Sequence, residues 1–165
     1  MASAQEILTI GHSTHPAERF VRLIRAHGVE AVCDVRRFPA SRRNPQFNAD
    51  ALREALNAAG IAYESFGDEL GGRRKPRSGG EPGPWRNAAF RGYAEYMETE
   101  EFARGLERLK ALARERRAAI MCAEGEWRRC HRRLISDTLL AHGWRVTHIR
   151  PDGRGEGHQP TLVAD

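Results

Sequence analysis

Short apolar segments alternate with amphipathic helical segments along most of this chain, and this alternation restricts its fold more than any other feature. The apolar runs are typical of buried strands and lie at residues 7–10, 29–35, 62–66, 118–122 and 144–149. Helical periodicity fills the intervals at residues 14–27, 48–59, 99–113 and 130–142. We therefore expect an α/β fold: a single Rossmann-like three-layer domain, with a mainly parallel sheet of about five strands and helices on both faces.

A length of 165 residues is close to the usual size of one domain, and the chain contains neither an internal repeat nor a linker. We expect a single domain over residues 1–165, with its core at about residues 7–150. Residues 71–87 hold five glycines and three prolines, which predicts a long mobile loop. The Gly-rich residues 151–165 are predicted to be a frayed tail.

Composition and charge limit the classes of function. No apolar run approaches the ~20 residues of a membrane span, and the N-terminus resembles no secretory signal, so we expect a cytoplasmic protein without membrane contact. A net charge of +5 favours an anionic small molecule or nucleic acid as partner. Arginines far outnumber the two lysines, so the abundance of arginine is not informative by itself. Only the placement of individual arginines along the chain is informative. The sequence indicates no cofactor and no particular oligomeric state.

Chemically versatile side chains follow three of the predicted strands. They are His12 and Ser13, Asp34 and Arg36, and Cys122 and Glu124. In open parallel sheets, ligands bind beyond the carboxyl ends of the strands. We therefore expect these side chains to converge on one cleft.

The same segments resemble the domain-of-unknown-function 488 family of bacterial and archaeal proteins. The matching pieces are T-I-G-H-S at 9–13, D-V-R-R-F-P-x-S-R at 34–42, P-Q-F-N at 45–48, L-G-G at 70–72, and C-A-E and C-H-R at 122–124 and 130–132. The resemblance spans residues 7–149 and implies a compact Rossmann-like domain, but it implies no reaction. One departure is Trp127, because the family usually carries a proline at or beside this position.

Three residues are candidates for catalysis: Cys122, Glu124 and His12. Cys122 and Arg128 have the C-x5-R spacing of cysteine-dependent phosphatases, although the two intervening carboxylates would repel a phosphate. The alternative is an inert, buried cysteine. Glu124 could form a general acid–base pair with His12 or His131, or could be a carboxylate that only caps a helix.

The cysteines also permit a metal site or a disulfide. Cys122, Cys130 and His131, with Cys33 as a fourth ligand, would form a zinc site, but the seven residues between the first two suit zinc poorly. We therefore assign no metal ligand. A reversible Cys122–Cys130 disulfide is a further alternative.

A dense polar loop after the second strand suits an anion. Its arginines, with Phe38 between them, are typical of sites where a guanidinium holds a phosphate and an aromatic ring stacks a base. Alternatively, Asp34 forms an internal ion pair with the following arginines. The full set of expected anion- or substrate-binding residues is Ser13, Asp34, Arg36, Arg37, Arg42, Cys130, His131 and Arg132.

The helix that begins at Cys130 carries basic residues at its positive end, which costs stability unless an anion lies there. We predict that Arg132 points into the cleft and that Arg133 points away. The leading hypothesis is an enzyme that acts on a phosphorylated or nucleotide-like substrate, as a Cys- or Glu/His-dependent hydrolase or transferase. The alternatives are a non-catalytic nucleic-acid-binding module, which would use residues 73–77 and 128–133, and a thiol or metal sensor.

Overall fold

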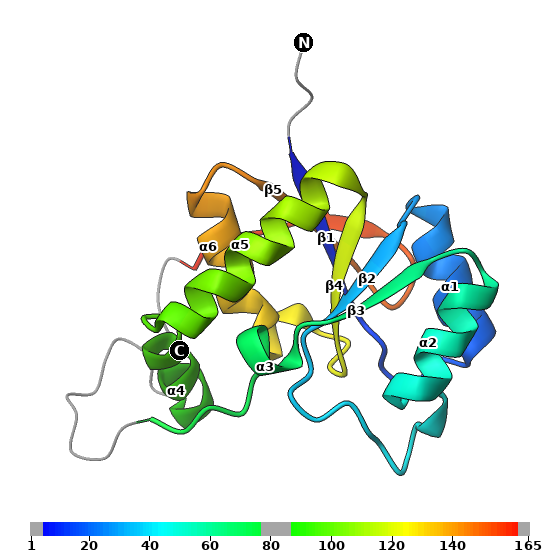
Figure 1. The fold of residues 1–165 in the computed structure, drawn as a ribbon, viewed down its shortest axis with the longest axis horizontal. Helices are drawn as coiled ribbons and strands as arrows, with labels where there is room; N and C mark the ends of the chain where they lie inside the picture. Colours follow the sequence, from blue (N-terminus) through cyan, green and yellow to red (C-terminus); the bar gives the residue numbers. More distant parts are fainter. Residues whose placement is uncertain (1–4, 77–86, 162–165) are drawn as a thin grey trace.

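The strands form one mostly parallel sheet. The computed structural model describes residues 5–76 and 87–161, and its six strands are ordered β3-β2-β4-β1-β5-β6. Five of them are parallel: β1 (Glu6–Gly11), β2 (Ala31–Asp34), β3 (Ala62–Ser65), β4 (Ala118–Cys122) and β5 (Arg145–Ile149). The sixth, β6 (Gly155–Gly157), pairs antiparallel with β5 at one edge (Figure 1). The predicted α/β fold with a mainly parallel sheet is confirmed.

Helices cover both faces of the sheet (Figure 1). On one face lie α1 (Ala17–Ala26) and α2 (Ala49–Ala58), the latter preceded by the 3-10 turn η1 (Pro45–Phe47). On the other lie α3 (Gly67–Leu70), α4 (Ala88–Tyr96), α5 (Glu100–Glu115) and α6 (Arg132–Ala141). A second 3-10 turn, η2 (Trp127–Arg129), precedes α6. The three layers predicted from the sequence are therefore present.

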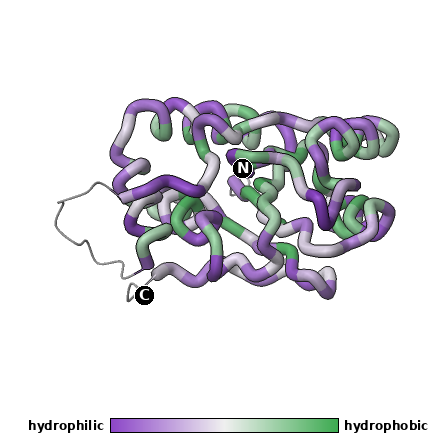
Figure 2. Tube along the Cα trace, turned by 90° about the horizontal axis from the view of Figure 1, so that it is seen from below, coloured by the Kyte–Doolittle hydropathy of each residue, from purple (hydrophilic) through white to green (hydrophobic). Residues whose placement is uncertain are grey.

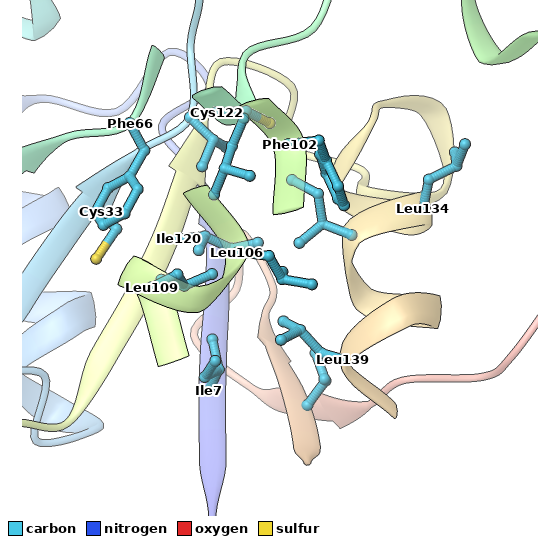
Figure 3. Close-up of a cluster of buried hydrophobic side chains, with 14 of the residues drawn as sticks. Ile7, Cys33, Phe66, Phe102, Leu106, Leu109, Ile120, Cys122, Leu134 and Leu139 are labelled. Atoms are coloured by element: carbon cyan, nitrogen blue, oxygen red, sulfur yellow. The ribbon is translucent and has the colours of Figure 1, made fainter. Parts of the chain in front are cut away.

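Two hydrophobic clusters hold the layers together. Successive residues of a strand point to opposite faces, so Ile7 packs with Leu106 and Leu139 whereas Leu8 packs with Phe20 and Leu56. Figure 3 shows the first cluster, between the sheet and helices α5 and α6. Along the helices, hydrophobic and hydrophilic residues alternate in Figure 2, as expected when only one side of each helix is buried.

The predicted helix ends agree with the backbone geometry. Gly28 and Gly60 follow α1 and α2 with φ angles of 71° and 76°, a region that glycine enters without steric cost. The Thr99 hydroxyl accepts a hydrogen bond from the amide of Phe102 and so caps α5.

Two features of the structure differ from the predicted elements. Helix α4 was not predicted, although Asn87 caps it by accepting hydrogen bonds from the amides of Ala89 and Phe90. Helix α6 begins at Arg132 because Cys130 has extended backbone angles. Residues 77–86 of the predicted mobile loop lie outside the described residues.

The prediction of a frayed tail is wrong for residues 155–158. β6 pairs with β5, and the amide of His158 donates to the carbonyl of Val146. The His158 side chain is fully buried between His148 and Asp137, at 2.9 and 2.7 Å. The sequence of this segment is short and Gly-rich, so its pairing depends on tertiary contacts that no local pattern indicates.

Over the described ranges, no helix combines the length and the apolar character needed to cross a membrane.

We expect His158→Ala to destabilise the fold, because it leaves the buried Nε2 of His148 without a hydrogen-bond partner. The expected loss in the free energy of unfolding is about 1–3 kcal/mol, measured by urea denaturation. Gln159→Ala is the matched control, since Gln159 is exposed and should change stability by less than ~0.5 kcal/mol. Equal stability of both variants would contradict the structural role of the tail.

Candidate functional site

A pocket lies beyond the carboxyl ends of β2 and β4, where the sequence predicted a ligand site. Its volume is about 190 Å³. It is formed by the loops after β2 and β4, the segment after α3 and the residues before α6. We call it the strand-end pocket, and its lining residues are Arg36, Arg37, Phe38, Gly72, Arg73, Cys122, Ala123, Glu124, Cys130 and His131.

The structure brings together six of the eleven residues proposed from the sequence. Arg36, Arg37, Cys122, Glu124, Cys130 and His131 line the pocket, whereas His12, Ser13, Asp34, Arg42 and Arg132 do not. Sequence analysis did not place Gly72 or Arg73 in this cleft. The sequence signal for Gly72 was the L-G-G motif at residues 70–72. The role of this motif is clear only in the structure, where the His131 ring lies against Gly72.

The two cysteine side chains of the pocket touch each other. Their Sγ atoms are 3.2 Å apart, and the Cys122 Sγ is also 3.5 Å from the carbonyl oxygen of Glu124. Burial raises the pKa of the Cys122 thiol well above its usual value. Burial alone would also raise the pKa of Cys130, but the hydrogen bond from Cys122 and the nearby guanidinium of Arg132 hold it well below the usual value. Cys130 is therefore the more acidic thiol of the pair.

This arrangement does not fit the phosphatase interpretation of Cys122 and Arg128. The Arg128 side chain forms ion pairs with Glu126 and Glu156 at 3.4 and 3.7 Å, and lies over the ring of Trp127. It does not line the strand-end pocket. The C-x5-R spacing is therefore coincidental here.

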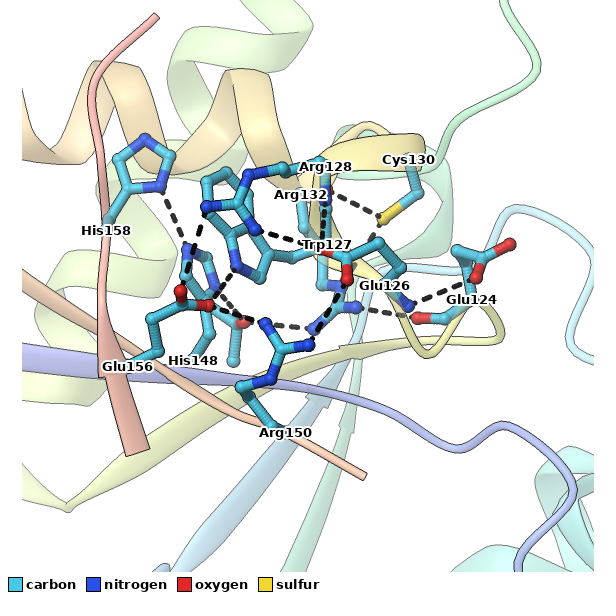
Figure 4. Close-up of polar contacts among 11 residues, drawn as sticks. Glu124, Glu126, Trp127, Arg128, Cys130, Arg132, His148, Arg150, Glu156 and His158 are labelled. Atoms are coloured by element: carbon cyan, nitrogen blue, oxygen red, sulfur yellow. Dashed lines mark hydrogen bonds and ion pairs between the residues drawn. The ribbon is translucent and has the colours of Figure 1, made fainter. Parts of the chain in front are cut away.

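Arg132 connects three separate segments at the end of the sheet (Figure 4). Its Nε donates to Cys130 Sγ at 3.3 Å, its Nη1 to the Thr9 hydroxyl at 3.0 Å and its Nη2 to the Glu124 carbonyl at 2.6 Å. Only 1% of the residue is exposed. Arg132 is turned away from solvent, but it does not line the strand-end pocket, so the prediction that it points into the cleft is wrong. Its donors are used by groups of the protein itself.

Arg133 points elsewhere, as predicted: its Nε donates to the Thr161 hydroxyl at 3.2 Å. The Glu124 carboxylate does not lie at Arg132 in place of an anion. That carboxylate is exposed and accepts from the amide of Glu126, while the carbonyl of Glu124 meets Arg132.

A chain of buried hydrogen bonds runs from Arg132 to the C-terminal segment. The Thr9 hydroxyl accepts from Arg132, so its own proton goes to His148 Nδ1 at 2.5 Å. His148 Nε2 must then donate to His158 Nδ1, and His158 Nε2 to the Asp137 carboxylate. Every donor therefore points away from Arg132.

Trp127, where this chain departs from the family that it resembles, closes this network on one side. Its ring stacks on His148 with centroids 4.1 Å apart, and its Nε1 donates to the Glu156 carboxylate at 2.9 Å. Trp127 thus connects the loop between the two cysteines to β6.

Gly11, in the T-I-G-H-S motif, allows the loop after β4 to approach β1 closely. A Cβ atom at this position would lie 1.8 Å from the carbonyl oxygen of Glu124. That carbonyl is the acceptor for Arg132. Only glycine therefore lets the acceptor reach its place.

Asp34 and Arg36 form an internal ion pair, the alternative considered for this loop. Arg36 Nε and Nη2 donate to the two Asp34 oxygens at 2.9 and 2.7 Å, and the Tyr63 hydroxyl donates to Asp34 at 2.6 Å. Asp34 is 1% exposed and is not on the pocket wall. It orients the Arg36 guanidinium, which is on that wall.

His12 and Ser13 hold the loops instead of lining the pocket. His12 Nδ1 donates to the carbonyl of Ser13, and its ring stacks on Phe47 at 4.3 Å. Burial lowers the pKa of His12 to about 4, so the ring is neutral. The amide of Ser13 donates to the carbonyl of Ala123 at 2.9 Å. Arg42 is exposed outside the pocket.

His131 is the imidazole that lies on the pocket wall. Its Nε2 donates to the carbonyl of Val35 at 2.8 Å, which leaves Nδ1 as the basic nitrogen. Burial lowers the pKa of His131, so the ring is neutral near pH 7. A Cβ atom at Gly72 would lie 2.9 Å from Nδ1, so glycine keeps this nitrogen uncovered.

The zinc hypothesis finds no support in the described ranges, where no three histidine, cysteine or carboxylate side chains are grouped as a metal site requires. Cys33 is fully buried in the core under α5 and does not line the pocket.

We expect acid to destabilise this protein through its buried neutral histidines. Burial lowers the pKa of His12 to about 4 and that of His148 to about 2. In the unfolded chain both titrate near 6.5, so below that pH the unfolded state binds more protons than the folded state. Between about pH 7.5 and 5, unfolding free energy should fall by about 2 kcal/mol per histidine. Urea denaturation across this pH range measures the fall in the free energy of unfolding. His12→Phe should remove the part of that fall that is due to His12.

We expect iodoacetamide near neutral pH to alkylate Cys130 and to spare Cys122 and Cys33, because only Cys130 is held as a thiolate. Peptide mass mapping identifies the modified residue. Arg132→Lys should move the pH midpoint of alkylation upward, whereas Arg133→Lys is a control that should leave it unchanged. A midpoint for Cys130 at the ordinary thiol value of about 8.5 would contradict this assignment.

Comparisons of the sequence with known proteins identify the family of this chain. A search of curated proteins and a search of solved structures each returned no match. The family model described as "Domain of unknown function DUF488" matches residues 16–139, which include most of the pocket and both of its cysteines. The chain therefore belongs to the DUF488 family.

Proposed function

We propose that this protein is an enzyme that binds a small anionic substrate, phosphorylated or nucleotide-like, in the strand-end pocket and attacks it with the Cys130 thiolate. One observation carries the proposal: Cys130 Sγ lies on the pocket wall, accepts a hydrogen bond from Arg132 and is 3.2 Å from Cys122 Sγ. A thiolate stabilised beside an open pocket is a nucleophile, whereas a structural cysteine is neutral and enclosed. Cys130 thus takes the role that the sequence suggested for Cys122.

The cations around the pocket support an anionic substrate. Arg36 is held in a fixed orientation by Asp34, while Arg37 and Arg73 flank the pocket without a carboxylate partner in the described residues. A planar guanidinium binds two oxygens of a phosphate or carboxylate. Among the described residues, Glu124 provides the only carboxylate that lines the pocket.

An exposed aromatic ring supports a flat substrate group. Phe38 is 58% exposed, and the guanidinium carbons of Arg37 and Arg73 lie 5.4 and 5.7 Å from its ring centre. A ring between two cations suits the stacking of a base that carries a phosphate. A solvent-exposed phenylalanine contributes nothing to the core, which favours a role in binding.

His131 is available for proton transfer. Its Nδ1 is unprotonated and is left uncovered by Gly72. After Cys130 has displaced a leaving group, His131 can accept a proton from the water that releases the product. We assign this role to His131 instead of His12, which is enclosed against Phe47.

Nucleic-acid binding is the second candidate, and one observation favours it. A groove of about 500 Å³ adjoins the strand-end pocket through Arg37 and Arg73, and continues past Arg74 and Lys75. Such a strip of cations could follow a phosphate backbone. Binding would then weaken steeply with salt. We place either activity in the cytoplasm, where thiols stay reduced.

We expect inorganic phosphate to protect Cys130 against iodoacetamide. The double substitution Arg37→Gln and Arg73→Gln should weaken this protection roughly tenfold or more, since a charged hydrogen bond contributes about 1.5–3 kcal/mol. Arg42→Gln removes the same charge outside the pocket and is the matched control. Rates of alkylation at increasing phosphate concentration provide the measurement. Equal protection in all three proteins would refute the anion site.

A further inference from the structure

We propose that the atom attacked by Cys130 is a sulfur, and that the protein reduces a disulfide bond in a small anionic substrate with Cys122 as the second, resolving thiol. This inference rests on the proposed function for the nucleophile and the pocket. It adds the reaction and a role for Cys122. The observation that carries it is the 3.2 Å contact between the two Sγ atoms at the wall of a cationic pocket.

The contact places the second thiol where exchange requires it. A disulfide bond is about 2.05 Å long, so the sulfur atoms need to approach by only a little more than 1 Å. Cys122 ends the rigid strand β4, and Cys130 lies in the extended residues before α6. Movement of the Cys130 side chain is therefore the simplest way to close the bond.

Other cysteine chemistry does not need Cys122. An enzyme that transfers a phosphoryl or acyl group uses one thiolate, and an apolar side chain could fill the space behind it. Here the space holds a second thiol that is 3% exposed and lies within hydrogen-bond distance of the nucleophile. The same hydrogen bond that stabilises the Cys130 thiolate keeps the resolving sulfur against it.

The steps balance without a metal or bound cofactor. The Cys130 thiolate attacks one sulfur of the substrate disulfide, forms a mixed disulfide and releases the other half as a thiolate, which takes up a proton. Cys122 loses its proton and attacks Cys130 Sγ, which forms the Cys122–Cys130 disulfide and releases the second half of the substrate. The protein loses two electrons and the substrate gains them. An external dithiol reductant must restore the protein for another cycle.

The pocket selects the substrate by charge. Arg36, Arg37 and Arg73 surround the two cysteines, so a disulfide that carries carboxylate or phosphate groups should react faster than a neutral one. Cys33 is fully buried away from the pocket and provides an internal control thiol.

The test uses the reduced, folded full-length chain and dithiobis(nitrobenzoate), an aromatic disulfide with a carboxylate on each half. Wild type should release two thionitrobenzoate molecules per chain and end as an unlabelled internal disulfide, two hydrogens lighter. Cys122→Ser should release one molecule and keep the other half attached to Cys130. Cys130→Ser should react much more slowly, and Cys33→Ser should behave as wild type.

The outcomes separate this inference from the proposed function. If wild type also retains one label on Cys130, the resolving role of Cys122 is wrong while the nucleophile in the pocket stands. If neither wild type nor Cys122→Ser reacts at Cys130, both fail. Replacing Arg37 and Arg73 by Gln should slow the reaction with dithiobis(nitrobenzoate) at least severalfold more than it slows the reaction with neutral dithiodipyridine. An equal effect on the two would overturn the selection by charge.

A second measurement covers the case in which Cys122→Ser folds poorly. Wild type is equilibrated with mixtures of oxidised and reduced dithiothreitol, and the cross-linked peptide is mapped by mass. A Cys122–Cys130 bond that forms and disappears reversibly supports the proposal. Failure to form it under fully oxidising conditions would overturn it.

Discussion

The buried guanidinium of Arg132 is the group on which the rest of the site depends. Enclosing an unpaired charge costs several kcal/mol, so every donor must find a partner. Those identified for Arg132 are a sulfur, a hydroxyl and a carbonyl, with no carboxylate among them in the described residues. The guanidinium in turn holds the pKa of Cys130 below its usual value, so ionisation of this thiol would supply the missing negative charge.

The surrounding structure fixes that arginine from several directions. Gly11 lets the Glu124 carbonyl approach β1, and Thr9 passes a hydrogen bond on to His148. His158 and Asp137 complete the chain from β6 and α6. Because each donor has one acceptor, the network has a single arrangement of protons, and it is rigid for that reason.

The pocket combines one fixed cation with two adaptable ones. Arg36 is fixed by two hydrogen bonds to Asp34, so it loses little freedom when an anion binds. Arg37 is exposed, and with Arg73 it flanks Phe38, which allows both to adjust to ligands of different shape. The proposed nucleophile, the proposed anion site and the imidazole of His131 thus meet at one edge of the sheet, although their residues lie almost a hundred positions apart.

The sequence by itself determined the layers, the parallel strands and the edge at which reactive groups collect. Hydrophobic periodicity and helix-ending residues such as Gly28, Gly60 and Thr99 are local signals, and they are readable without a structure. It also indicated that Arg132 and Arg133 point in different directions, since helix geometry fixes the angle between neighbouring side chains. Only the tertiary structure decided which cysteine is the more acidic, that Asp34 is an internal partner of Arg36, that His12 lies outside the pocket and that residues 155–157 form an edge strand. These outcomes depend on burial and on distances between segments remote in the chain, and no local pattern encodes either.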